Sequence, residues 1–178
     1  VPGGYGEQSG TSMASPNMAG VMAIMRSYVK QAFGLTDPVE INRQAMQLVM
    51  STAVTAYDQD GLAYSPRKQG AGVANMDLAI ASSAYLSTNV EGNDYRPKLE
   101  LGDDAKKTGV YEANFYVTNF GDRELCFTTD QLVMTETLAS NGLTVSEQAR
   151  MLDKAETVWT VDGQTVNEIT VGKDTTVT

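Results

Sequence analysis

Histidine is absent from this sequence of 178 residues, and cysteine and tryptophan occur once each. Because a nucleophilic serine usually needs a neighbouring base, the missing imidazole means that the chain holds no complete Ser-His pair. The single cysteine, Cys126, excludes an internal disulfide. Its neighbours Leu125 and Phe127 predict that it is a small, buried apolar side chain.

Positive charge is also scarce, with 13 Lys and Arg residues against 22 Asp and Glu and a net charge of −9. This balance argues against nucleic acid or an anionic membrane surface as the main partner, because both require clustered basic residues. No apolar run approaches the about 18–20 residues of a transmembrane helix, so we expect no membrane insertion within this chain. With 42% hydrophobic residues, the chain can bury a core.

The N-terminal part predicts a helix over residues 12–33 that is apolar on nearly every side. A helix of this kind requires burial all round. Gly34 suits the position after its C-terminus, and Lys30 lies in the last turn. We therefore expect the apolar surface of this helix to be incompletely buried in the chain alone. Such exposure favours self-association or a non-native arrangement. The face at helical spacing comprises Val21, Ile24, Met25, Tyr28 and Val29, and Met18, Ala19, Met22 and Ala23 lie on the other side.

A second helix is predicted over residues 38–55, with Asp37 as N-cap, Pro38 at the first position and Glu40 placed as in a capping box. A third, over residues 76–84, follows Asn75 as N-cap. The second helix is amphipathic: its buried face is predicted as Ile41, Ala45, Leu48, Val49 and Thr52, and its solvent face as Asn42, Arg43, Gln44 and Gln47. In the third, Leu78, Ala79 and Ala81 are expected to face inward.

A stretch rich in turn signals, YDQDGLAYSPRKQGAG, separates these two helices. Asp58 and Asp60 within it are predicted to form turns rather than to act as catalytic carboxylates. The three helices have no predicted strand among them, so we expect them to cover a sheet that this chain does not contain.

The pattern changes after residue 87. Residues 88–92 are typical of a linker, and from about residue 96 the hydrophobic period becomes two, as in Phe115 and Val117. Short strands with frequent glycine turns favour an all-β sandwich over residues 96–178. Residues 146–155 are predicted as a small helix or an irregular insertion. The predicted strands are Lys98–Leu101, Tyr111–Val117, Glu124–Thr129, Leu132–Thr137, Thr157–Val161 and Val166–Val171, with another opening at Thr175–Thr178.

Ser12 stands directly before the apolar run, in the block SGTSMASPNMAG at residues 9–20. A serine in this place can simply cap the helix by accepting a hydrogen bond from a free amide. The same helix terminus would also favour negative charge at a nucleophilic oxygen and on an oxyanion beside it. The residues alone leave both interpretations open, and one terminus can serve both roles.

The block from Gly10 to Pro16, continuing to Ala19-Gly20, resembles the active-site serine signature of the subtilisin-like serine proteases (subtilases). Tyr64–Gly72 is similar to the end of the catalytic domain in lactocepin-like cell-envelope proteinases, which continue into a fibronectin-type-III-like β-sandwich. The sequence departs from the family pattern at Asn17, where histidine is common in the family. That histidine is not the catalytic base, so the change is read as tolerable variation.

The resemblance implies an α+β fragment. Residues 1–87 would be the helical C-terminal part of an α/β subtilisin-like catalytic domain, and residues 96–178 a truncated sandwich. Ser12 would be the nucleophile, with Gly10, Thr11 and Met13 at the substrate-binding rim. The Asp and His of the triad would lie in the missing N-terminal part of the domain, because the family order is Asp, His, Ser. The fragment would therefore be inactive alone.

The function implied is that of a secreted or cell-surface serine endopeptidase that acts on polypeptides with no metal or other cofactor. Two alternatives stay open. The first is a degenerate protease whose β-sandwich binds a partner protein. The second is a tripeptidyl-peptidase-like subtilase, because Ser15-Pro16-Asn17 also occurs in such enzymes.

Overall fold

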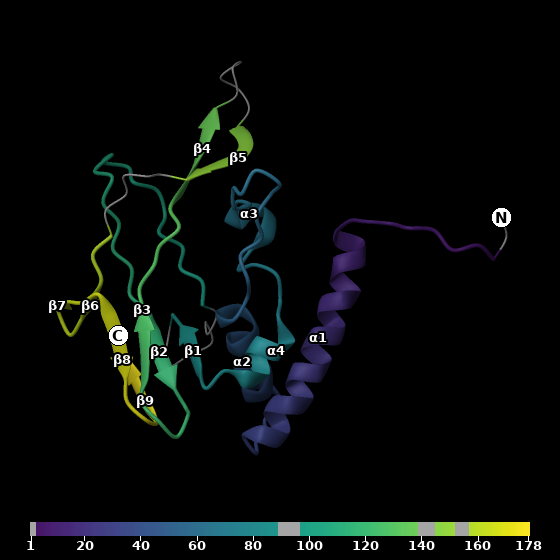
Figure 1. Cartoon of the computed structure of the whole chain (residues 1–178), viewed down its shortest axis with the longest axis horizontal. Coiled ribbons are helices and arrows are strands. Elements are labelled where there is room, and N and C mark those ends of the chain that lie inside the picture. The colour runs from purple at the N-terminus through teal and green to yellow at the C-terminus, as the bar shows by residue number, and fades with distance from the viewer. Residues whose placement is uncertain (1–2, 89–96, 139–144, 152–156) are drawn as a thin grey trace.

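The computed structural model describes residues 3–88, 97–138, 145–151 and 157–178. A layer of helices from the first part of the chain lies beside small antiparallel sheets from the second part (Figure 1). This combination of helices and strands confirms the predicted α+β class in its coarse form. A fibronectin-type-III-like sandwich stays a prediction.

The first helix, α1 (Thr11–Ala32), confirms the predicted element within one residue. Its C-cap is Phe33, whose N–H donates to the Val29 carbonyl oxygen at 3.0 Å, and Gly34 follows with a positive φ of 64°. Met25 and Val29 are fully buried, whereas residues 11–20 are all exposed. The helix is therefore covered only along one side of its C-terminal half, and its N-terminal half projects from the rest of the described chain (Figure 1).

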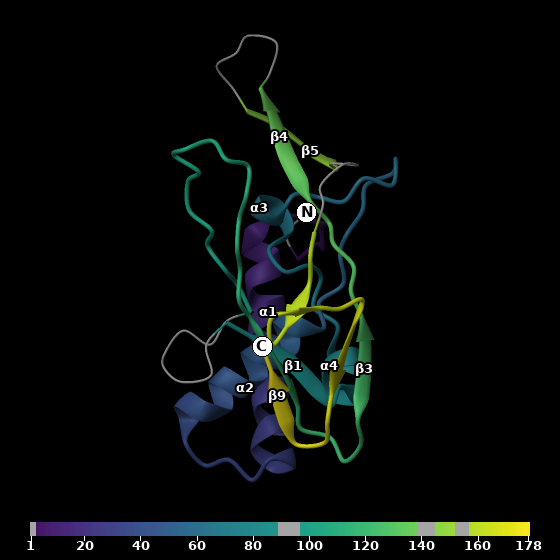
Figure 2. The ribbon, with the colours of Figure 1, turned by 90° about the vertical axis from the view of Figure 1, so that its left-hand side faces the viewer.

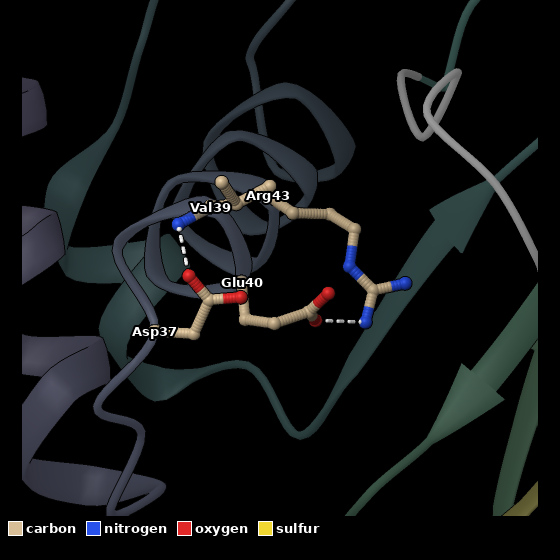
Figure 3. A network of polar contacts seen from close by, with 4 residues as sticks. All are labelled: Asp37, Val39, Glu40 and Arg43. Carbon is tan, nitrogen blue, oxygen red and sulfur yellow. Dashed lines mark hydrogen bonds and ion pairs between the residues drawn. The ribbon is translucent and has the colours of Figure 1, made fainter.

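The second helix, α2 (Pro38–Ser51), begins at the predicted cap. A carboxylate oxygen of Asp37 accepts the N–H of Val39 at 3.0 Å (Figure 3). Glu40 forms an ion pair with Arg43 instead of reaching back to the N-cap amide, so only half of a capping box is present. The helix ends at Ser51, four residues earlier than predicted.

The burial of α2 is wider than the sequence predicts. Ile41, Ala45, Leu48 and Val49 are buried as expected, but Gln44 and Gln47, predicted to face solvent, are buried too. The reason is that α2 contacts both α1 and the strand β1 (Ala84–Ser87), so a second side of the helix is covered. Ser51 strengthens the second contact, since its hydroxyl oxygen accepts the Leu86 N–H at 2.8 Å.

Residues 54–73 fold back on themselves, with isolated bridges between Val54 and Val73 and between Tyr57 and Ala63. The Asp58 carboxylate accepts the N–H groups of Asp60 and Leu62, each at 2.9 Å. This geometry confirms Asp58 as a turn-forming residue. The four-residue helix α3 (Pro66–Gln69) lies within this segment.

The fourth helix, α4 (Met76–Ala81), starts at the predicted N-cap, since the Asn75 side chain accepts the Leu78 N–H at 3.1 Å. Only Ala79 is buried; Leu78 and Ala81, predicted to face inward, are exposed. A helix this short contacts α1 and α2 along a single line, which Ala79 occupies.

β1 corrects the prediction, which placed no strand before residue 96 and extended the third helix to residue 84; α4 ends at Ala81 instead. β1 pairs antiparallel with β2 (Tyr116–Asn119), which pairs on its other side with β9 (Thr175–Val177). A second antiparallel pair joins β3 (Leu125–Thr128) to β8 (Glu168–Val171). Buried Val117 of the first sheet shares a core cluster with Ile169 and Val171 of the second.

The remaining strands form two hairpins, β4 (Met134–Leu138) with β5 (Val145–Met151) and β6 (Thr160–Val161) with β7 (Gln164–Thr165). The first hairpin projects from the other sheets (Figure 2). β5 replaces the small helix or irregular insertion predicted from residue 146, because its backbone pairs with β4. The end of that prediction, residues 152–155, lies outside the described residues, as do residues 89–92 of the predicted linker.

Three further predictions for this region are wrong. Residues 98–101 form no strand, and the strand predicted from Tyr111 begins only at Tyr116, where β1 and β9 supply partners. Cys126 is exposed rather than buried, because alternation along β3 turns Leu125 and Phe127 inward and Cys126 outward. Its thiol lies 3.5 Å from a carboxylate oxygen of Glu168.

Candidate functional site

Ser12 is the second residue of α1 and is exposed at the end of the helix that projects from the chain (Figure 1). The N-cap is Gly10, with φ 146° and ψ 175°, and no side chain caps the helix. The interpretation of Ser12 as an N-cap residue is therefore wrong: Ser12 lies inside the first turn, and its hydroxyl has no hydrogen-bond partner among the described residues.

The backbone around Ser12 offers unpaired amides. The N–H groups of Met13 and Ala14 donate to the Gly10 carbonyl oxygen at 3.0 and 3.1 Å, whereas no acceptor among the described residues engages the N–H groups of Thr11 and Ser12. Such free amides, together with the helix dipole, favour a negative charge at this terminus. The end of α1 can therefore stabilise an anionic oxygen close to the serine hydroxyl.

Pro16 adds a feature that the sequence-based predictions missed. It lies inside α1, four residues after Ser12, and has no N–H to donate. The Ser12 carbonyl oxygen therefore receives no helical hydrogen bond from position 16. The signal was present in the sequence as the four-residue spacing between the serine and the proline.

The structure places all four predicted site residues side by side at this terminus. Gly10, Thr11, Ser12 and Met13 are consecutive and exposed, and the Met13 side chain retains 43% of its accessible surface. No titratable base belongs to the group, and the whole chain contains no histidine. The site can present a serine hydroxyl and amide donors, but it has no group to take the serine proton.

Residues 2–72, which include this terminus, match the sequence profile of the subtilase family. This segment is similar to part of a subtilase domain. Three relatives are similar to it: the C5a peptidase of Streptococcus pyogenes, 35% identical over 54% of this chain; the minor extracellular protease Vpr of Bacillus subtilis, 42% identical over 48%; and the PI-type proteinase of Lactococcus lactis subsp. cremoris, 32% identical over 71%.

The chain spans about a tenth of the length of these relatives, with 9%, 10% and 7% covered respectively. The match to the PI-type proteinase covers more of the chain than residues 1–87 can supply, so it reaches into the β-stranded part. The similarity to proteases therefore includes both parts of the chain.

A cavity of about 410 Å³ lies away from Ser12, between the end of α2, β1 and β3. Its lining is largely apolar, and none of its residues precedes Ser51. Within the described ranges, no group of three His, Cys, Asp or Glu side chains could hold a metal ion. In the same ranges, no helix has the length and hydropathy needed to cross a membrane.

Proposed function

We propose that the complete protein is a serine endopeptidase and that Ser12 is its nucleophile. The observation that carries this proposal is the position of Ser12: it is exposed in the first turn of a helix with free amides, inside the segment that matches the subtilase family. The Ser12 hydroxyl attacks the carbonyl carbon of a peptide bond, and its own backbone N–H donates to the oxyanion that forms. Gly10, Thr11 and Met13 border the bound polypeptide.

The base and its orienting carboxylate come from residues outside this sequence, because the chain contains no histidine. Members of a catalytic triad act as a unit, so removing the base abolishes most of the serine's reactivity. The chain alone is therefore inactive. A parent protein that also lacks Asp and His motifs would instead be a degenerate protease.

Labelling with a serine-directed fluorophosphonate tests this assignment. In the full-length protein the probe is expected to modify Ser12, and Ser12→Ala should abolish both labelling and peptide hydrolysis. Ser15→Ala is the matched control, because Ser15 is exposed on the same helix and should leave both unchanged. The 178-residue chain should not be labelled; strong labelling of it would contradict the need for an external base. An unlabelled full-length protein would favour the degenerate protease.

The remaining assignments extend the same proposal. Residues 96–178 belong to a fibronectin-type-III-like sandwich, for which the shared core of Val117, Ile169 and Val171 is the support. The protein acts outside the cell or at its surface, as the name of the extracellular Bacillus protease suggests. The exposed apolar half of α1 leads the chain to self-associate when it is alone.

A further inference from the structure

We propose that Phe120 is a positioning residue for Ser12. Phe120 belongs to the β-stranded part of the chain, and it fixes the C-terminal end of α1, the helix that carries Ser12. This inference rests on the proposed role of Ser12 as the nucleophile. It assigns the β-stranded part a role in the reaction beyond that of an accessory module, because the helix that presents the nucleophile is held by a residue from that part.

The contact is made by four aromatic rings, which we call the aromatic clasp: Tyr28, Phe33, Tyr85 and Phe120. The ring of Phe120 lies edge-on to that of Phe33, with centroids 5.0 Å apart and planes at 69°. Tyr85 of β1 stacks on Phe120 at 6.0 Å, and Tyr28 meets Phe33 at 6.5 Å. Edge-on and stacked pairs at these distances stabilise a contact beyond the burial of their area.

Phe120 is held rigidly in this place. Its N–H donates to the Ser83 carbonyl oxygen at 2.9 Å. The preceding residue, Asn119, is fully buried, and its side-chain oxygen accepts the Gly121 N–H at 2.9 Å. At Gly121 a Cβ atom would lie 2.8 Å from the Ser83 Cβ, so only glycine permits this approach. The turn that presents Phe120 is thus fixed on both sides.

The other partner in the clasp, α1, is held at its C-terminal half, where it packs on α2 and α4 and its Tyr28 ring meets the clasp. Its buried residues, Met25 and Val29, lie in the C-terminal half, and residues 11–20 are exposed. Ser12 lies about 30 Å from Phe33 along the helix, at 1.5 Å per residue. A small tilt at the clasp therefore becomes a displacement of several ångströms at Ser12. A displacement of about 1 Å at a reacting group can lower a rate by about a hundredfold.

Hydrogen exchange on the 178-residue chain tests the clasp without reference to activity. Phe120→Ala should lower the protection of amides in residues 25–33 by about tenfold or more, because that end of α1 loses its ring contacts. Phe120→Leu keeps the apolar volume and should fall between Ala and the unchanged chain, which keeps the test informative if the alanine variant unfolds. Phe115→Ala is the matched control, since Phe115 pairs with Trp159 inside the β-stranded part. Equal loss of protection in the control would contradict the clasp.

Steady-state kinetics of the full-length protein tests the positioning role. Phe120→Ala should lower kcat by about tenfold to a hundredfold with KM changed less than about twofold, and Phe120→Tyr should restore kcat because it keeps the ring. An unchanged kcat in Phe120→Ala, while Ser12→Ala is inactive, would overturn this inference and leave the proposed function intact. Activity retained by Ser12→Ala would overturn the proposed function itself.

Discussion

The side-chain amide nitrogen of Asn119, at the end of β2, donates to the backbone carbonyl oxygen of Val171, at the end of β8, at 3.0 Å. The same nitrogen also lies 2.8 Å from the carbonyl oxygen of Arg123 and 3.0 Å from that of Gly172. One buried side chain therefore joins the two small sheets and closes the turn that carries Phe120. Asn119 is fully buried, and its bond to the Val171 oxygen is buried with it, so water does not replace this donor.

We expect Asn119→Ala to lower the free energy of unfolding by about 1–3 kcal/mol, because it removes the side-chain donor to the buried Val171 carbonyl oxygen. Urea unfolding followed by circular dichroism measures this change. Asn119→Asp should also destabilise at neutral pH, since a carboxylate cannot donate to the Val171 oxygen. Asn114→Ala is the control, because Asn114 is exposed. A midpoint for Asn119→Ala equal to that of the control would show that the amide bridge contributes nothing.

Gly72→Ala should destabilise the fold by about 1–3 kcal/mol, for two reasons. The backbone has φ 127°, and the added Cβ would lie 2.6 Å from the Val54 carbonyl oxygen, inside the bridge between Val54 and Val73. Gly20→Ala is the matched control with the opposite sign. A Cβ added at Gly20, in α1, would meet no atom within 4 Å outside the backbone of its own helix, so alanine should stabilise by about 0.5–1 kcal/mol. Thermal melts of both variants measure the change in stability. A Gly72→Ala variant that melts at the same temperature as the unchanged chain would contradict the clash.

Acidification should release the loop around Asp104. The N–H of Gly109 donates to the Asp104 carboxylate at 2.6 Å, and with the contacts from Thr108 it holds the pKa of that carboxyl below its ordinary value. A carboxyl with a lowered folded pKa stabilises the fold above its unfolded pKa, and this contribution is lost as pH falls through the folded pKa.

An NMR titration of the Asp104 carboxyl and the Gly109 amide checks this expectation. Both signals should move together, with a midpoint below about 3.9, the usual value for aspartate. Asp104→Asn should remove the transition at Gly109, and Asp103→Asn should leave it in place. A midpoint at or above the usual value would contradict the hydrogen-bonded arrangement.

The exposed apolar side of α1 should make the chain self-associate when it is alone. Ile24 and Met18 retain 51% and 39% of their accessible surface, and residues 18–25 contain no polar side chain. Light scattering should therefore show oligomers that dissociate on dilution, and the double variant Met18→Gln with Ile24→Gln should raise the monomer fraction. Val158→Gln is the control, because Val158 is exposed in the β-stranded part. A clean monomer with well-protected α1 amides would contradict the expectation.

Local signals account for the elements that the sequence predicted correctly. Asp37 and Asn75 cap their helices as expected, and Gly34 ends α1, because caps and positive-φ glycines act through the nearest backbone groups. The predictions that failed depended on distant partners. Gln47 is buried because β1 covers α2, and the strand predicted from Tyr111 starts only at Tyr116, where β1 and β9 pair with it.

The sequence by itself determined where the candidate nucleophile lies along the chain and that no histidine of this chain could serve it, because both follow from residue identity. It also determined the boundaries of α1 and the start of α2, which depend on contacts within a few residues. Only the tertiary structure decided that Gly10 rather than a side chain caps α1, that β1 joins the helical part to the sheets, and that Phe120 contacts Phe33. The last two of these features bring together residues far apart in the chain, and their contact depends on packing and strand register rather than on local pattern.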